Sequence, residues 1–188
     1  MKDRREKVLT RGFFSKSQEP GSAPIVERFL KKFLVKLIVT VFGVGCLPWM
    51  PGTWGSLVAI PLGVYLASFG PLVFFASFFV LAIGGWFFTK LYLEKNPGNQ
   101  DPSEVVIDEV AGQFLALAPL LWMPSGAHWI IPAAFIGFRA FDIFKPWPVS
   151  WADRIHGSFR KSALGVMLDD VVAAGYVIML CLLLHLLT

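Results

Sequence analysis

Residues 138–170 read FRAFDIFKPWPVSWADRIHGSFRKSALGVMLDD, and this stretch decides the fold because one apolar run ends in it and another begins. Arg139, Asp142 and Lys145 recur every three residues at the end of the first run, and Asp169 and Asp170 lie in the opening turns of the second. Charges of both signs at the ends of segments long enough to cross a bilayer are costly unless they are paired or used. The stretch therefore predicts a membrane protein with a functional site at this junction.

The composition indicates the same class. Hydrophobic residues make up 55% of the 188-residue chain and charged residues 16%, whereas soluble domains carry roughly a quarter charged residues. The net charge is +4, but the basic residues are interrupted by Phe-rich runs, which argues against a nucleic-acid partner. Cys46 and Cys181 stand far apart in apolar surroundings, which predicts two buried thiols and neither a disulfide nor a zinc site.

The order of polar and apolar stretches predicts an all-α, multi-pass membrane helical bundle. Residues 1–27 are expected to be a disordered basic tail, and residues 28–188 a single membrane-embedded domain. Residues 27–41 place Lys and Arg three or four apart and predict a basic amphipathic helix on an anionic membrane surface, or the start of the first crossing. About five hydrophobic helical segments follow. They cover residues 57–69, 72–91, 105–122, 129–144 and 165–187.

Residues 41–56 contain four glycines and two prolines, so we expect a loop there. Thr53 and Ser56 precede the first apolar segment, and either could cap its first turn. A glycine-rich loop before a helix offers backbone N–H groups to an anion. A tight turn at the membrane surface is the alternative interpretation.

Counting reversals between the five segments places every Lys and Arg on the side of the N-terminus or at helix ends facing it. Positive charge concentrates on the cytoplasmic side of membrane proteins, so the N-terminus is predicted to be cytoplasmic. The same counting brings five carboxylates to one depth on that side. They are Asp108, Glu109, Asp142, Asp169 and Asp170.

Five neighbouring carboxylates repel one another unless a cation neutralises them. Oxygen ligands favour Mg²⁺, and less strongly Ca²⁺ or Mn²⁺. Arg139, Lys145 and Arg154 stand beside these acids in the sequence, as the binding of a phosphate monoester requires. The alternative is a set of interfacial ion pairs, since Arg139–Asp142 and Asp142–Lys145 are both spaced i,i+3. The adjacent Asp169 and Asp170, met by a second acidic pair, favour the metal.

The chain resembles the phosphatidylglycerophosphatase A family from about residue 41 to its C-terminus. The resemblance rests on PGTWGSLVAIP (51–61), VIDEVAGQ (106–113), FRAFDIFKPWP (138–148), ADR (152–154) and GVMLDDVVA (165–173), in this order. It implies a Mg²⁺-dependent lipid phosphatase of the bacterial cytoplasmic (inner) membrane. Such an enzyme would convert phosphatidylglycerophosphate to phosphatidylglycerol and phosphate. Residues 158–164 are an insertion relative to the family pattern, and could bind lipid headgroups.

We accordingly assign roles to the charged residues as a hypothesis. Asp108, Glu109, Asp169 and Asp170 would hold one or two Mg²⁺ ions, with Asp142 as ligand or base. Arg139, Lys145, Arg154 and the backbone after Thr53 would bind the phosphate. Attack by a metal-activated water is preferred over a phospho-aspartyl intermediate, because the DxD-type signature that accompanies the latter is missing. The metal count and the oligomeric state stay open.

Other functions were weighed against this one. The site could serve another phosphate monoester lipid, or the acids could form the path of a non-enzymatic membrane cation transporter. A transporter would need its carboxylates at mid-membrane, whereas these are predicted near one face. Residues 124–128 resemble a fragment of the phosphatidic-acid-phosphatase type 2 motif, but with the wrong spacing. The acid pattern of CDP-alcohol transferases is not present.

Overall fold

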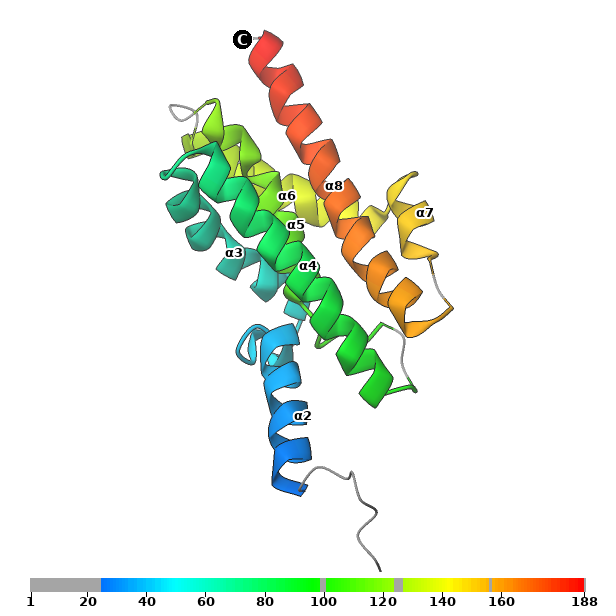
Figure 1. Ribbon diagram of the computed structural model, residues 1–188. Helices are drawn as coiled ribbons and strands as arrows, with labels where there is room; N and C mark the ends of the chain where they lie inside the picture. Colours follow the sequence, from blue (N-terminus) through cyan, green and yellow to red (C-terminus); the bar gives the residue numbers. More distant parts are fainter. Residues whose placement is uncertain (1–24, 99–100, 124–126, 156, 188) are drawn as a thin grey trace, which may run out of the picture. The chain divides into compact units, whose positions relative to one another are not determined.

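The computed structural model describes residues 25–98, 101–123, 127–155 and 157–187, and in these residues it is helical without a β-strand. The elements are α2 (Ile25–Val39), η1 (Val44–Cys46), α3 (Pro51–Ala67), α4 (Pro71–Lys95), α5 (Ile107–Ala116), η2 (Ala118–Leu121), α6 (Ala127–Phe144), α7 (Val149–Asp153) and α8 (Phe159–Leu187) (Figure 1). The chain divides into two compact units, residues 1–31 and 32–188, and α3 to α8 all belong to the second. Most of the predicted tail, and residues 124–126 of the phosphatase-like fragment, lie outside the described residues.

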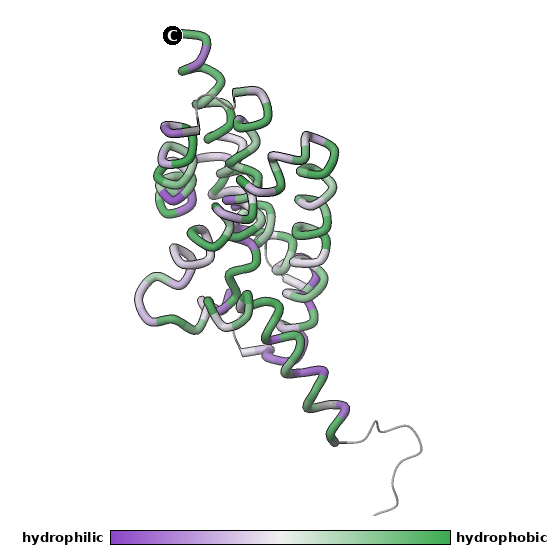
Figure 2. The backbone as a smooth tube through the Cα atoms, turned by 90° about the vertical axis from the view of Figure 1, so that its left-hand side faces the viewer, coloured by the Kyte–Doolittle hydropathy of each residue, from purple (hydrophilic) through white to green (hydrophobic). Residues whose placement is uncertain are grey.

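The all-helical class is confirmed, but five membrane crossings are not. Among the described helices, α4 and α8 are the two that are long and apolar enough to cross a membrane. The predicted segment 105–122 instead splits into α5, which has only ten residues, and η2. Ten residues of helix span about 15 Å, half the hydrocarbon core of a bilayer. Hydrophobic residues nevertheless predominate along the helices (Figure 2).

The short helix α5 is the centre of the second unit and packs against α3, α4, α6 and α8. Eight of its ten residues are buried. Phe114 stacks on Phe74 of α4 with ring centroids 4.5 Å apart. Gly112 lets α6 and α8 approach closely, since a Cβ at this position would lie 2.7 Å from the Phe138 ring and 2.8 Å from the Asp170 Cβ. This contact places the start of α5 beside the charged stretch of α8.

The prediction of a loop over residues 41–56 is wrong at its C-terminal end, because α3 already begins at Pro51. Proline suits the first turn of a helix, where its missing N–H would have no partner. Met50 is the N-cap, so Thr53 and Ser56 lie inside the helix and do not cap it. The Ser56 hydroxyl donates to the Gly52 carbonyl at 2.9 Å. Among the two thiols, Cys181 is buried as predicted, whereas Cys46 is exposed.

The predicted amphipathic helix is present as α2, two residues earlier than expected at each end. Its Lys36 pairs with Glu104 at 2.8 Å, and the Tyr92 hydroxyl donates to the same carboxylate. These two hydrogen bonds hold the pKa of Glu104 below its usual range. The Val106 N–H also donates to the Val39 carbonyl at 3.0 Å. The C-terminal part of α2 thus anchors the segment that leads into α5.

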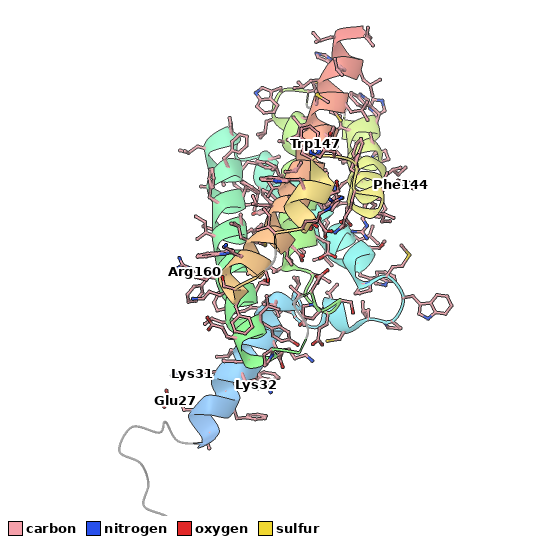
Figure 3. All side chains as sticks on the ribbon, turned by 90° about the vertical axis from the view of Figure 1, so that its right-hand side faces the viewer. Glu27, Lys31, Lys32, Phe144, Trp147 and Arg160 are labelled. Atoms are coloured by element: carbon pink, nitrogen blue, oxygen red, sulfur yellow. The ribbon has the colours of Figure 1, made fainter. Side chains whose placement is uncertain are left out.

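The predicted start of the last helix at residue 165 is six residues too late, because the inserted residues form the first turns of α8. The Ser158 hydroxyl accepts a hydrogen bond from the Lys161 N–H at 3.4 Å, as a capping side chain does. Arg160 lies over the Trp86 ring of α4, 5.9 Å from its centroid, at the surface of the molecule (Figure 3). The insertion therefore extends α8 along α4.

Candidate active site

A cavity of about 390 Å³ opens where α3, α5, α6, α7 and α8 meet. Among the described residues, it is lined by seven carboxylates and two cationic side chains, together with a few apolar residues. The carboxylates are those of Asp101, Asp108, Glu109, Asp142, Asp153, Asp169 and Asp170, and the cations are Arg139 and Lys145. The cavity therefore collects acids from α5, α6, α7, α8 and the segment before α5.

Five of these carboxylates form two overlapping groups. Asp108 and Glu109 of α5 meet Asp170, and we call this set the α5 triad. Asp142 of α6 meets Asp169 and Asp170, and we call this set the α6 triad. Within each triad, one oxygen from each carboxylate lies within 4.8 Å of the others, and Asp170 belongs to both. The structure thus brings together all five acids that the sequence singled out.

The carboxylates are deeply buried, and several of their oxygens have no partner. Asp108 is 7% exposed and Asp170 2% exposed. Asp108 Oδ1, Glu109 Oε2 and Asp170 Oδ2 are buried without a hydrogen-bond partner. A buried ionised carboxylate without a partner is strongly unfavourable, and a cation held between these oxygens would offset that cost. Carboxylate oxygens at this spacing fit a hard divalent ion such as Mg²⁺.

The two cationic side chains are bound to the α6 triad. Arg139 Nη1 donates to Asp142 Oδ2 at 2.6 Å, and Arg139 Nε is buried without a partner. Lys145 Nζ donates to Asp169 Oδ2 at 2.9 Å and also to Asp153. Burial lowers the pKa of Lys145, but these two hydrogen bonds outweigh it, so the pKa lies above its usual value. Lys145 therefore stays cationic beside the acids.

Two of the predicted phosphate-binding residues do not line the cavity. Thr53 lies in the first turn of α3, where its N–H donates to the Met50 carbonyl at 2.9 Å and its hydroxyl has no partner. Arg154 is exposed at the C-terminal end of α7. The predicted roles of these two residues stay untested.

Two residues at the cavity were not predicted from the sequence. Asp153 belongs to the ADR motif, but only the short helix α7 turns it toward Lys145. Gly52 lies against the acids, since a Cβ there would collide with the Glu109 carboxylate and lie 3.2 Å from Arg139 Nη1. The signal for Gly52 was the PGTWGS stretch, which was interpreted as a loop.

The fold and cavity define a helical protein with a buried carboxylate centre and two cations beside it. The family model of Phosphatidylglycerophosphatase A matches residues 37–185, so the chain belongs to this family. It is 36% identical to the phosphatidylglycerophosphatase A of Escherichia coli K12, over 73% of this chain and 75% of that protein. The enzyme of the same name from Haemophilus influenzae is 36% identical over 77% of this chain and 84% of its own length.

A third relative carries a different name. A Bacteroides thetaiotaomicron protein, described as a candidate phosphatidylinositol-3-phosphatase, is 37% identical over 77% of this chain and 89% of that protein. No solved structure gives a significant match to the chain.

Proposed function

We propose that this chain is a Mg²⁺-dependent phosphatase that hydrolyses phosphatidylglycerophosphate to phosphatidylglycerol and phosphate, in phosphatidylglycerol biosynthesis. One observation carries the proposal. In a family whose Escherichia coli and Haemophilus influenzae members are named phosphatidylglycerophosphatase A, unpartnered buried carboxylate oxygens stand beside an arginine and a lysine in one cavity.

The chain's own residues divide into metal-holding and phosphate-binding groups. Asp108, Glu109, Asp169 and Asp170 would hold Mg²⁺, which when bound supplies Lewis-acid polarisation of the phosphoryl group and a water activated for attack. Arg139 Nε is buried without a partner, and with the adjacent Nη2 it forms the edge of the guanidinium that can donate to two phosphate oxygens, a geometry that lysine cannot match. We assign phosphate binding to Arg139 and Lys145, because these two cations line the cavity.

In the proposed mechanism, Asp142 and Asp153 position the two cationic side chains. Asp142 holds the Arg139 guanidinium, and Asp153 holds the Lys145 ammonium together with Asp169. These contacts keep both cations in the cavity before a phosphate group binds. Asp142 is also near enough to Asp169 and Asp170 to serve as a metal ligand or as a base.

Two exposed apolar side chains line the cavity, which suits a lipid substrate. Met50 and Ile143 line the cavity and are nevertheless 60% and 55% exposed. Their chain neighbours Trp49 and Phe144 are 89% and 82% exposed, and Phe144 projects from the end of α6 (Figure 3). Exposed aromatic side chains of this kind settle at the interface between lipid and water. A phosphate in the cavity would thus be attached to a molecule that remains in the membrane.

Replacing both Trp49 and Phe144 by Ser is expected to raise KM for substrate in vesicles by about tenfold or more, since each aromatic ring buried in lipid contributes about 1.5–3 kcal/mol. The measurement is phosphate release from phosphatidylglycerophosphate in vesicles and from a short-chain analogue in solution. The short-chain rate should barely change. Leu72→Ser removes an equally exposed side chain that does not line this cavity, and serves as the control. Equal losses for both substrates would contradict a role in lipid access.

The proposal includes a location. Two apolar helices and the concentration of Lys and Arg support a multi-pass protein of the bacterial inner membrane, with residues 28–188 as one domain. The positive-inside rule orients the N-terminus and the active site toward the cytoplasm. Cysteine accessibility on the two sides of sealed vesicles tests this orientation. Cys46 is suitable, because it is exposed and precedes α3.

The proposed activity is tested by phosphate release from purified protein in detergent micelles. Hydrolysis of phosphatidylglycerophosphate should stop when a chelator is added and return with Mg²⁺. Phosphatidylinositol 3-phosphate is the competing substrate, because the Bacteroides thetaiotaomicron relative carries that name. Faster phosphate release from phosphatidylinositol 3-phosphate would show that this lipid is the preferred substrate. Cation flux in vesicles without phosphate release would show that the protein is a transporter and not an enzyme.

A further inference from the structure

We infer that the acid cluster is two unequal cation sites that share Asp170, and that phosphate binding opens the second one. The α5 triad would hold the first ion tightly. The α6 triad would hold the second weakly until Arg139 and Lys145 leave its carboxylates for a phosphate group. The inference rests on the proposed function and goes beyond it in metal number, order of binding and the exchange of partners.

The α5 triad is ready to accept an ion as it stands. Each of its three residues presents an oxygen that is buried and has no partner. An ion entering this triad therefore displaces no ion pair. It also removes the electrostatic cost of three uncompensated buried carboxylates. Both effects predict tight binding.

The α6 triad is already engaged. Asp142 Oδ2 accepts from Arg139 at 2.6 Å, and Asp169 Oδ2 accepts from Lys145 at 2.9 Å. Asp169 Oδ1 also accepts the N–H of Asp170 at 3.0 Å. An ion here competes with two charge-assisted hydrogen bonds, which are about twice as strong as neutral ones. The second site is therefore expected to be weaker than the first.

The charge of the cavity argues that a single ion is not enough. If all are ionised, seven carboxylates against two cations leave an excess of five negative charges. One divalent ion leaves three, and such a site repels a phosphate dianion. A second divalent ion leaves one. Filling both triads thus removes most of the negative charge that repels phosphate.

A phosphate group resolves the competition within the α6 triad. Arg139 binds phosphate oxygens in a bidentate manner better than it binds one carboxylate oxygen, and Lys145 supplies a point charge. When both turn to phosphate, the oxygens of Asp142 and Asp169 become free for an ion. Phosphate and the second ion therefore bind with positive coupling, and the coupling acts in both directions.

Mn²⁺ titration of the full chain in detergent, followed by electron paramagnetic resonance, tests this inference. Without phosphate we expect one tight Mn²⁺ per chain and a second at least about tenfold weaker. Inorganic phosphate should tighten the second by about tenfold or more, and leave the first unchanged. Two bound ions that share Asp170 should also broaden each other's signal. One Mn²⁺ under all conditions, or a second ion indifferent to phosphate, would overturn the inference.

Three variants separate the two sites. Asp108→Asn should remove the tight ion, whereas Asp142→Asn should remove the weak one and its response to phosphate. Arg139→Gln should tighten the second ion without phosphate, because a competitor is gone, and should abolish the phosphate effect. Arg139→Lys, which retains the charge, covers the case in which the Gln variant fails to fold. Glu94→Gln alters an exposed acid outside the cavity and should change nothing.

Loss of the tight ion in Asp142→Asn, or a weaker second ion in Arg139→Gln, would contradict the assignment. Phosphate release from the lipid is measured separately. An active enzyme that binds only one ion would contradict this inference but not the proposed function. Two coupled ions in a protein that is inactive on every phosphate monoester lipid would support this inference and contradict the proposed function.

Discussion

Asp170→Asn is expected to reduce phosphate release from phosphatidylglycerophosphate by about a thousandfold or more, which corresponds to about 4 kcal/mol in the barrier. Asp170 is the residue common to both triads, and it is 2% exposed. Asparagine has nearly the same size but removes a negative charge and one ligand oxygen from both metal positions at once. The measurement is the initial rate at saturating Mg²⁺, with Mn²⁺ stoichiometry on the same preparation.

Asp101→Asn is the matched control, since it makes the same change at the edge of the cavity but outside both triads. Its rate should stay within about threefold of the unmodified protein, because a partly screened charge contributes little. Thermal unfolding in detergent should show that both variants are folded. If Asp170→Asn kept more than about a tenth of the activity, a loss below 1.4 kcal/mol, the metal assignment would be wrong.

Gly112→Ala is expected to destabilise the protein by about 1–3 kcal/mol and to impair catalysis, although alanine normally favours a helix over glycine. The added Cβ would meet the ring of Phe138, which is fully buried, and the Cβ of Asp170. Neither can move without shifting α6 or α8 against α5. The shift would separate Asp170 from Asp108 and Glu109, so tight Mn²⁺ binding should weaken together with stability.

Gly175→Ala provides the comparison, because it places the same substitution in α8 where a Cβ would meet nothing within 4 Å. It should be neutral or stabilise by up to about 1 kcal/mol. The midpoint of thermal unfolding and the Mn²⁺ affinity are measured for both variants. A Gly112→Ala protein as stable as Gly175→Ala would show that close packing of α5 does not hold the site together.

Much of the site could be predicted because acids are rare in the apolar parts of this chain. Asp108, Glu109, Asp142, Asp169 and Asp170 stood out by position, and the motifs around them led to the family, which the comparisons confirm. Their spacing in sequence could not reveal that they form two triads joined at Asp170. Nor could it distinguish the pairing of Lys145 with Asp153 and Asp169 from a pairing with Asp142, which was the alternative interpretation.

The sequence by itself determined the helical class, the family and the identity of the acids, since hydrophobic runs and buried charge leave few alternatives. The tertiary structure decided the length of α5, the helical start at Pro51, the place of Asp153, and which of the predicted residues line the cavity. Apolar composition sets only that a segment is buried. Whether protein or lipid buries the segment depends on the neighbouring helices. In this protein α5 is surrounded by α3, α4, α6 and α8, and Gly112 allows α6 and α8 to pack closely against it.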